Sequence, residues 1–404
     1  MKKKSLVRGY FVLYLLIAMS VFLFILGDLI SSIGIERLAG TNAVEREQAF
    51  AAADAGFDYY RWHLAHFPGD LQDGTNQSGP YTHDVIDPLS SDDEGTFSLA
   101  LSGVTSCNVL TSATITSTGV ATGSPRSVIL KGVFGKPTMA ASTSPALSDQ
   151  TRLTADLTTL KSYAQANGDY IAHSPSGDYG YQVTMNGNGT MSVTPVTGVT
   201  QVWGFSNEDA WKQENSVIAS LGSATQYSIP ANCPVVFIED NVWLQGTVSG
   251  KVTLAAADLV DTGVDSDLII PGNITYAHND YTDGLTAIGE HSVLIALNSP
   301  DVMTLQGVFV ADKGHFGRNR YTTNGVHAVP GAYSSDITRT SIAIDGTYAS
   351  PGSVTLKWTD SNGAFISGYS TETDAHDGLL GENPPPFTPE TADDFRLLDW
   401  RIQN

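Results

Sequence analysis

The chain has 404 residues, and its 42 acidic residues against 21 basic ones give a formal net charge of −21. A surface that binds nucleic acid needs clustered Lys and Arg to neutralise phosphates, so this charge argues against nucleic acid as a partner. The length suffices for two or three domains with hydrophobic cores. Beyond the N-terminal region, the abundance of Gly, Thr, Ser, Val and Asn is typical of turn-dense, mainly β folds.

The N-terminus combines a basic cluster with a long apolar run. Lys2, Lys3, Lys4 and Arg8 precede residues 10–27, none of which is charged. At about 1.5 Å per residue, such a helix can cross a hydrocarbon core of roughly 30 Å. The basic flank predicts a cytoplasmic N-terminus and an exported body. A cleaved signal peptide is an alternative, but its apolar core is normally only about 7–15 residues long.

Helical character continues beyond this run. Apolar residues fall seven apart and form one stripe, at Ala43, Phe50, Phe57 and Leu64. "FPGDLQDG" then stops the pattern. The sequence therefore predicts a long helix over residues 10–67, membrane-spanning in its first half and amphipathic in its second. A membrane anchor with a juxtamembrane helix explains the same pattern.

The first seventy residues resemble a known family. A basic leader (residues 1–9) ending in Gly9, the aromatic Tyr10 and about twenty apolar residues look like the type III signal of type IV pilins. "EREQAFAAADAGFDYYRWHL" (45–64) is similar to the stretch that follows in minor pilins of the PilX type. The resemblance implies cleavage between Gly9 and Tyr10 by a prepilin peptidase, and packing of the helix against other pilin subunits. It also implies residence in the inner membrane before assembly.

One position departs from the pilin pattern. Most major pilins carry Glu five residues after the cleavage site, whereas this chain has Tyr14. Some minor pilins also lack that Glu, so an accessory subunit fits better than the repeating one. N-methylation of Tyr10 stays open.

The next regions predict a β head and a small mixed segment. "GTFSLALSGVTSCNVLTSATITSTGVATGSPRSVILKGVF" (95–134) alternates apolar and polar residues, which predicts three or four antiparallel strands in a head over 68–135. Residues 136–150 are expected to be a linker. Within 151–227 we expect a short helix and a hairpin at the Asn-Gly of "YQVTMNGNGTMSVTPV". The helix should bury Leu153, Leu157, Leu160 and Ala164, begin after Ser148 or Asp149, and end at Gly168.

Residues 228–370 contain an irregular repeat of the form apolar-x-Gly-x-apolar. It begins at Leu244, Ile270, Leu305 and Ile344, with short apolar strands between. Such units bury little surface alone and gain a continuous core when stacked, so we predict an irregular right-handed β-helix, or solenoid. A β-sandwich is the alternative. Residues 371–404 are expected to form an extended cap that ends in a strand.

Three groups of residues are candidates for ligands or covalent bonds. Cys107 and Cys233 can form a disulfide or stay as two buried thiols. Acidic residues near two turns offer oxygen ligands for calcium, although solvated turns explain them as well. They are Asp261, Asp265, Asp267, Asp280 and Asp283. "KGHFGRNRY" predicts either a loop that binds a glycan or surface ligand, or a local ion-pair network, through His315, Arg318, Arg320 and Tyr321.

No familiar catalytic motif occurs, and we expect neither an enzyme nor a cofactor other than calcium. The first hypothesis is a minor pilin-like structural or adhesive subunit of a type IV pilus or pseudopilus, which displays a β-solenoid at the cell surface. The alternative is a membrane-tethered β-helix that binds or degrades surface polysaccharide. A scaffold that only polymerises is a third possibility.

Overall fold

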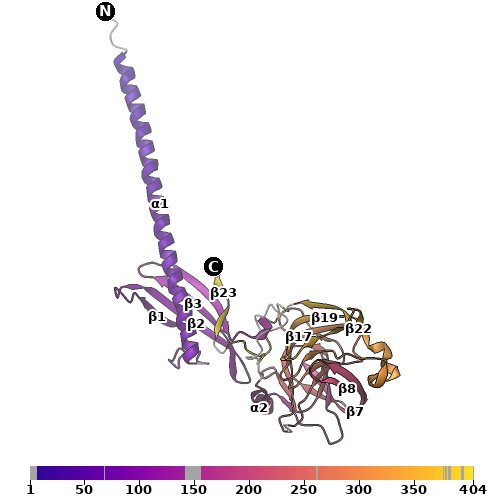
Figure 1. The fold of residues 1–404 in the computed structure, drawn as a ribbon. Coiled ribbons are helices and arrows are strands. Elements are labelled where there is room, and N and C mark those ends of the chain that lie inside the picture. Colours follow the sequence, from indigo (N-terminus) through magenta and orange to yellow (C-terminus); the bar gives the residue numbers. More distant parts are fainter. Residues whose placement is uncertain are drawn as a thin grey trace, which may run out of the picture. The chain divides into compact units, whose positions relative to one another are not determined.

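The computed structural model describes residues 7–67, 69–141, 156–260, 263–375, 377, 380, 384–392 and 395–403. The chain divides into two compact units (Figure 1). Unit 1 comprises residues 1–102, 114–132 and 400–404, and unit 2 comprises residues 103–113 and 133–399.

Unit 1 begins with one continuous helix, α1, over Val7–His66, as the sequence predicts (Figure 1). At 1.5 Å per residue, its 60 residues span about 90 Å. Every side chain from 10 to 41 is exposed, including large apolar ones such as Phe24 at 74%. The second half buries Ala49, Ala53, Phe57 and Leu64. The first half of the helix therefore has an exposed apolar surface, and the second half has one buried face.

A five-stranded sheet follows, in the order β1-β2-β3-β4-β23. The bounds are β1 Tyr81–Ile86, β2 Asp93–Ser106, β3 Val109–Ala121, β4 Ser127–Gly135 and β23 Arg396–Gln403. The alternation that predicted strands in 95–134 appears as burial of every second residue of β3, among them Ala113, Ile115 and Ser117. β1 was not predicted as a strand, because its mostly polar sequence lacks a clear alternation of apolar and polar residues.

The expected cap, residues 371–404, covers the repeats of unit 2 only in part: Leu380 and Phe387 pack against their core, whereas the last strand does not. β23 instead lies beside β4 at the edge of the five-stranded sheet. Gly135 supplies a physical reason, because a Cβ at this position would lie 2.8 Å from Cδ1 of Leu398. Gly135 leaves room for Leu398, a residue that we expected in the C-terminal cap.

Two glycines let α1 approach the sheet closely. A Cβ on Gly119 of β3 would collide with the backbone of α1 at Ala49 and Ala53. A Cβ on Gly56 of α1 would collide with the hydroxyl of Ser117. At Gly119 the strand therefore lies directly on the backbone of α1, and at Gly56 the helix backbone lies directly on side chains of the sheet.

Unit 2 is built from parallel strand ladders. The longest joins seven strands by consecutive parallel pairing, from β5 to β10, β12, β15, β17, β19 and β22. Their bounds are β5 Asp169–Ile171, β10 Val235–Ile238, β12 Lys251–Ala256, β15 Gly284–Gly289, β17 Val302–Ala311, β19 Thr338–Ala349 and β22 Phe365–Ala375.

Two further ladders share β11 (Val242–Val248). One runs from β6 through β11 and β14 to β17, and the other from β11 through β13 and β16 to β18 and β20. The bounds are β6 Tyr181–Asn186, β13 Leu268–Ile270, β14 Ile274–Tyr276, β16 Val293–Ile295, β18 Phe316–Gly317 and β20 Val354–Thr355. Buried Val, Ile and Leu side chains of all three ladders form one core, which is expected when parallel strands are covered on both faces.

The repeated glycine string has a structural counterpart in this pairing. Gly307 of β17 lies directly opposite Gly346 of β19, with Leu305 opposite Ile344. Both glycines have positive φ, and a Cβ on Gly346 would collide with the carbonyl oxygen of Gly307. Only these last two copies of the string align, because Gly246 lies opposite Ile274. At Gly307 and Gly346 the backbones of neighbouring strands approach too closely for a side chain.

Antiparallel additions complete unit 2. β7 (Thr190–Ser206) pairs with β6, with β8 (Ala210–Leu221) and with β9 (Thr225–Ser228), and β21 (Lys357–Thr359) pairs with β22. The β6–β7 hairpin confirms the Asn-Gly prediction. Short 3₁₀ helices lie at η1 Met139–Ala141, η2 Gly325–His327 and η3 Gly331–Asp336.

The expected segment boundaries need correction at two places. Residues 151–227 are no separate segment, because β5 and β6 pair in parallel with β10 and β11. The expected linker, residues 136–150, contains η1 and an antiparallel bridge from Thr138 to Glu390, and its remainder from 142 lies outside the described residues.

The short helix of unit 2, α2, covers Leu157–Asn167. Asp156 caps its N-terminus by accepting the N–H of Thr159 at 2.9 Å, whereas the expected caps Ser148 and Asp149 lie outside the described residues, as does Leu153. The helix buries Leu157, Leu160 and Ala164 and ends at Gly168, as predicted.

We predict that Gly119→Ala destabilises unit 1 by about 1–3 kcal/mol, because the added methyl group collides with the backbone of α1. Hydrogen exchange of peptides covering 49–64 should accelerate. Gly40→Ala is the matched control, since a Cβ there meets nothing within 4 Å. Equal exchange in both variants would contradict the close approach.

Candidate functional sites

The basic segment 313–321 does not form an exposed ligand-binding loop. Arg318 is only 1% exposed, and its guanidinium donates to the carbonyls of Leu297, at 2.8 Å, and Ile337, at 3.0 Å. Tyr321 is 2% exposed and donates its hydroxyl to Glu214 at 2.6 Å. These side chains hold neighbouring turns together, so the glycan-loop interpretation of this segment was wrong.

The other two residues of that group also face protein. His315 is 5% exposed, and its Nε2 lies 3.1 Å from Oδ1 of Asn319. The Arg320 guanidinium lies 5.9 Å from the ring centroid of Trp211. An ion pair does occur at the start of the segment, where Lys313 lies 2.6 Å from Asp265 and 3.0 Å from Glu290.

The structure does not gather the carboxylates proposed for calcium. Asp265 pairs with Lys313, and Asp267 accepts the ring N–H of His291 at 2.9 Å. Asp283 accepts the backbone N–H of Gly250 at 2.7 Å, and Asp280 bonds to Thr282. Asp261 lies outside the described residues. Within the described ranges, no three His, Cys, Asp or Glu side chains are placed to hold a metal ion.

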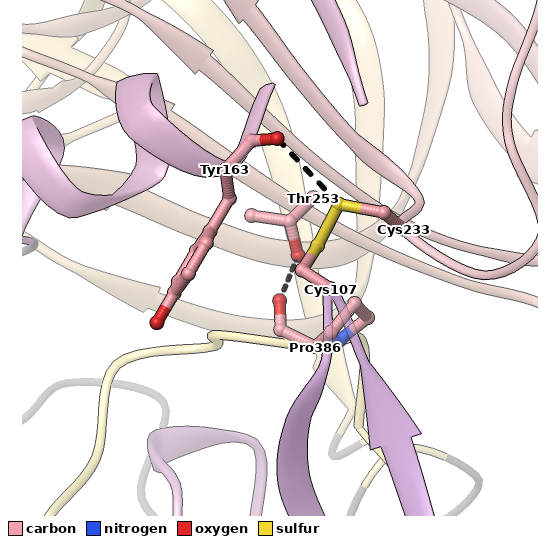
Figure 2. Close-up of a disulfide and its surroundings, with 5 residues drawn as sticks. All are labelled: Cys107, Tyr163, Cys233, Thr253 and Pro386. Atoms are coloured by element: carbon pink, nitrogen blue, oxygen red, sulfur yellow. Dashed lines mark hydrogen bonds between the residues drawn. A yellow bond between two sulfur atoms is a disulfide. The ribbon is translucent and has the colours of Figure 1, made fainter. Parts of the chain in front are cut away.

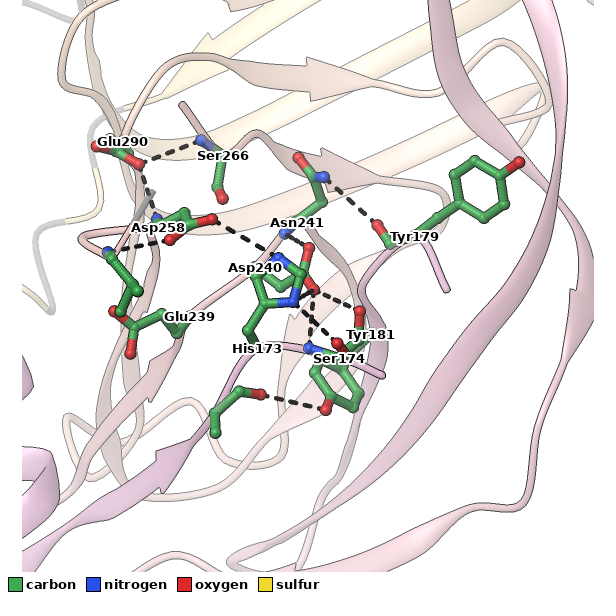
Figure 3. Close-up of polar contacts among 12 residues, drawn as sticks. His173, Ser174, Tyr179, Tyr181, Glu239, Asp240, Asn241, Asp258, Ser266 and Glu290 are labelled. Atoms are coloured by element: carbon green, nitrogen blue, oxygen red, sulfur yellow. Dashed lines mark hydrogen bonds and ion pairs between the residues drawn. The ribbon is translucent and has the colours of Figure 1, made fainter. Parts of the chain in front are cut away.

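A different acidic network lies where strands of the longest ladder end (Figure 3). Glu239, Asp240, Asp258 and Glu290 are each at most 5% exposed. Glu290 accepts the backbone N–H groups of Asp258, at 2.8 Å, and Ser266, at 3.2 Å. Asp240 and Asp258 likewise accept the backbone N–H groups of Ser174 and Val260, so the network stabilises the turns.

Basic groups balance this network. Lys161 of α2 forms an ion pair with Glu239. The ring of His173 lies between Asp240, at 3.7 Å, and Asp258, at 3.6 Å (Figure 3). A hydrogen bond to the carbonyl of Ser174, aided by these carboxylates, raises the pKa of His173. Acidic residues follow each of these apolar strands in the sequence, but only the strand register shows that their side chains lie one above another.

Unit 2 also contains a cavity of about 270 Å³, beside the hairpin formed by β7 and β8. Three apolar residues in register, Trp243, Ile269 and Leu294, line it. Polar side chains from the hairpin and from the strand ends line the rest, among them Lys212 and His291. Sequence reasoning missed this site, because its residues come from five separate segments.

A polar ladder runs along one wall of the cavity. The side chain of Asn241 accepts the backbone N–H of Asp267 at 2.9 Å. The side chain of Asp267 accepts the backbone N–H of Ser292 at 3.0 Å, and the side chain of Ser292 accepts the backbone N–H of His315 at 3.1 Å. Each side chain thereby joins the start of one strand to the next.

Cys107 and Cys233 form a disulfide within unit 2, with Cα atoms 4.4 Å apart (Figure 2). Cys107 lies at the turn between β2 and β3, and Cys233 precedes β10. Both cysteines are buried, and the Tyr163 carbonyl of α2 lies 3.8 Å from the Cys233 sulfur. The bond therefore fixes the turn between β2 and β3 to the start of the longest ladder's second strand.

Within the residues that the structure describes, one helix, α1, is long and apolar enough to cross a membrane. Its apolar part is the segment whose side chains are all exposed. In this respect the chain fits a single-pass membrane anchor near the N-terminus. Gly9 and Tyr10, the expected processing site, lie within the first turns of α1.

No protein-family model and no curated protein matches this chain. Among solved structures, it is similar to the competence-associated pilin ComZ from Thermus thermophilus, at 10% sequence identity and a TM-score of 0.22. The match covers 89% of this chain and 98% of that one. The superposition is too loose to support a conclusion about this chain.

We predict that Cys107→Ser with Cys233→Ser lowers the unfolding free energy of unit 2 by about 2–5 kcal/mol, because the bond closes a loop of more than a hundred residues. Denaturant unfolding with and without reductant measures the effect. Reductant should destabilise the parent chain alone. Equal midpoints for parent and double variant without reductant would contradict the bond.

His291 should make stability pH-dependent. Its hydrogen bond to Asp267 raises its pKa. The folded state thus holds the proton more tightly, and the stabilisation is complete below the unfolded pKa, about 6.5, and lost as pH rises through the folded pKa. His291→Gln should lower the denaturation midpoint at pH 6 more than at pH 8. An equal loss at both pH values would exclude this linkage.

Proposed function

We propose that this chain is a pilin-like subunit of a type IV pilus or a related pseudopilus, with a structural rather than catalytic role. The observation that carries the proposal is the division of α1 into an exposed apolar half and a half that packs on an antiparallel sheet. The first half suits two apolar surroundings in turn, the bilayer before assembly and the helices of other subunits afterwards.

The pattern of burial along α1 supports a helix that lies first in the bilayer and then against other subunits. From 10 to 41, every side chain is exposed. From Ala49 onwards, buried residues recur three or four apart and face the sheet. A membrane anchor alone needs only the first half, whereas a packing subunit also needs a rigid connection to its folded body. The continuous helix provides that connection.

The finer assignment rests on the N-terminal residues. We propose cleavage after Gly9 by a prepilin peptidase, a cytoplasmic leader and an exported body that reaches the cell surface with the filament. Lys2, Lys3 and Lys4 support the orientation. Tyr14 in place of the usual Glu supports an accessory, minor position in the filament.

We also propose that unit 2 is a β-solenoid displayed for surface contact or adhesion. Its support is the consecutive parallel pairing of β10, β12, β15, β17 and β19, each one step further along the chain. In a solenoid, each coil buries its apolar face on the next, and this pattern of pairing is the one expected.

We predict that a host with prepilin peptidase produces a chain that begins at Tyr10, and that a host without the enzyme retains residues 1–9. Gly9→Val should prevent cleavage, because the enzyme would meet a branched side chain at the cut. Gly27→Val, in the same apolar segment and with open space at its Cβ, should leave cleavage intact. Mass spectrometry of the N-terminus measures both. Retention of residues 1–9 in every host would overturn the proposal.

A further inference from the structure

The last strand of the chain, β23, is an exposed edge of the five-stranded sheet. Its neighbour on one side is β4, and no other strand among the described residues lies along its second side. Seven of its eight residues are exposed, and only Leu398 is half-buried. The backbone of such an edge is a template on which another strand can pair.

The opposite edge of the same sheet, β1, is protected against such pairing. β1 has six residues against eight in β23, begins directly after Pro80, and pairs irregularly with β2 between Val85 and Ile86. Short strands, prolines and bulges are devices by which natural sheets prevent association through their edges. β23 contains neither proline nor lysine, so these devices are present at one edge of the sheet and missing at the other.

The two faces of β23 differ in chemistry. Because successive side chains of a strand point to opposite faces, Leu398, Trp400 and Ile402 lie on one face. Trp400 is 50% exposed and Ile402 is 43% exposed. Asp399 and Arg401 lie on the other face, two positions apart. The strand thus carries an exposed apolar row on one face and two opposite charges on the other.

This pattern is complementary to itself when the strand direction is reversed. Two antiparallel copies related by a two-fold axis at Trp400 place Asp399 of each copy opposite Arg401 of the other. The same register places Leu398 of each copy opposite Ile402 of the other. Moving the axis to residue 399 or 401 would instead oppose two carboxylates or two guanidinium groups, and like charges opposite each other are destabilising.

We propose that two copies of this chain pair through β23, antiparallel and centred on Trp400, and so join their two five-stranded sheets into one continuous sheet. The contact uses the same edge in both copies, so it closes at a dimer. The proposal does not rest on the pilin-like role of α1. Cleavage after Gly9 and pairing through β23 can therefore each fail without the other.

The test is sedimentation velocity of the full chain at increasing concentration, in a detergent matched to the density of the solvent. We expect a monomer–dimer equilibrium. Asp399→Arg or Arg401→Asp alone opposes like charges at two symmetric places and should weaken dimerisation about tenfold. The double variant, with both reversals, restores opposite signs and should dimerise as the parent does.

Asp84→Arg is the matched control, because it makes the same change of charge at an exposed position of the opposite edge, β1. It should dimerise as the parent does. Association through α1 would leave all four variants equal to the parent. A monomeric parent, a dimer that neither single reversal weakens, or a double variant as weak as the single ones would overturn the proposal.

Cross-linking tests the register. The two native cysteines are bonded to each other, so Trp400→Cys introduces one free thiol. A residue on the axis lies opposite its own copy, with Cα atoms roughly 4.5–5.5 Å apart, a separation that a disulfide can bridge. Trp400→Cys should therefore form a disulfide-linked dimer under mild oxidation, and Thr82→Cys on the exposed side of β1 should not. No cross-link at residue 400, or an equal one at residue 82, would refute the pairing.

Discussion

Unit 1 depends on the contact between the second half of α1 and its sheet. Side chains of both elements normally separate a helix from the sheet on which it packs. Gly119 and Gly56 have no side chain, so the two elements lie closer together at these positions. The backbone of α1 is then fixed at Ala49 and Ala53, four residues apart on one face. Because the helix is continuous, this fixation sets the direction of the exposed apolar half as well.

Unit 2 obeys a different constraint, the in-register stacking of parallel strands. Stacking places residues of like position above one another, so a polar residue before one strand meets a polar residue before the next. The side chains of Asn241, Asp267 and Ser292 use this arrangement, each accepting a backbone N–H from the following segment. Buried carboxylates serve the same purpose, as Glu290 shows by accepting two backbone N–H groups. The negative charge is therefore partly structural.

Local patterns in the sequence predicted the local elements. The seven-residue spacing from Ala43 to Leu64 predicted α1, Asn-Gly predicted the β6–β7 hairpin, and Gly168 predicted the end of α2. Each of these depends on interactions between residues close in the sequence.

Long-range partners were not predictable in the same way. Arg318 looked like a surface cation, and only the folded chain brings the carbonyls of Leu297 and Ile337 to it. The pairing of β23 with β4 and the cavity row from Trp243 to Leu294 likewise require a register that one sequence does not encode locally. For the same reason, the acidic residues suggested calcium before their backbone partners were known.

The disulfide has a mechanical consequence. It joins residues 126 positions apart, so β3, β4, α2 and the β6–β7–β8 strands all lie inside one covalent ring. The covalent path from α1 to the strands after Cys233 then runs through the two sulfur atoms and bypasses the enclosed segments. When the unfolded chain is stretched, the oxidised form can extend only by the segments outside Cys107–Cys233. The reduced form can also extend by the residues between the two cysteines.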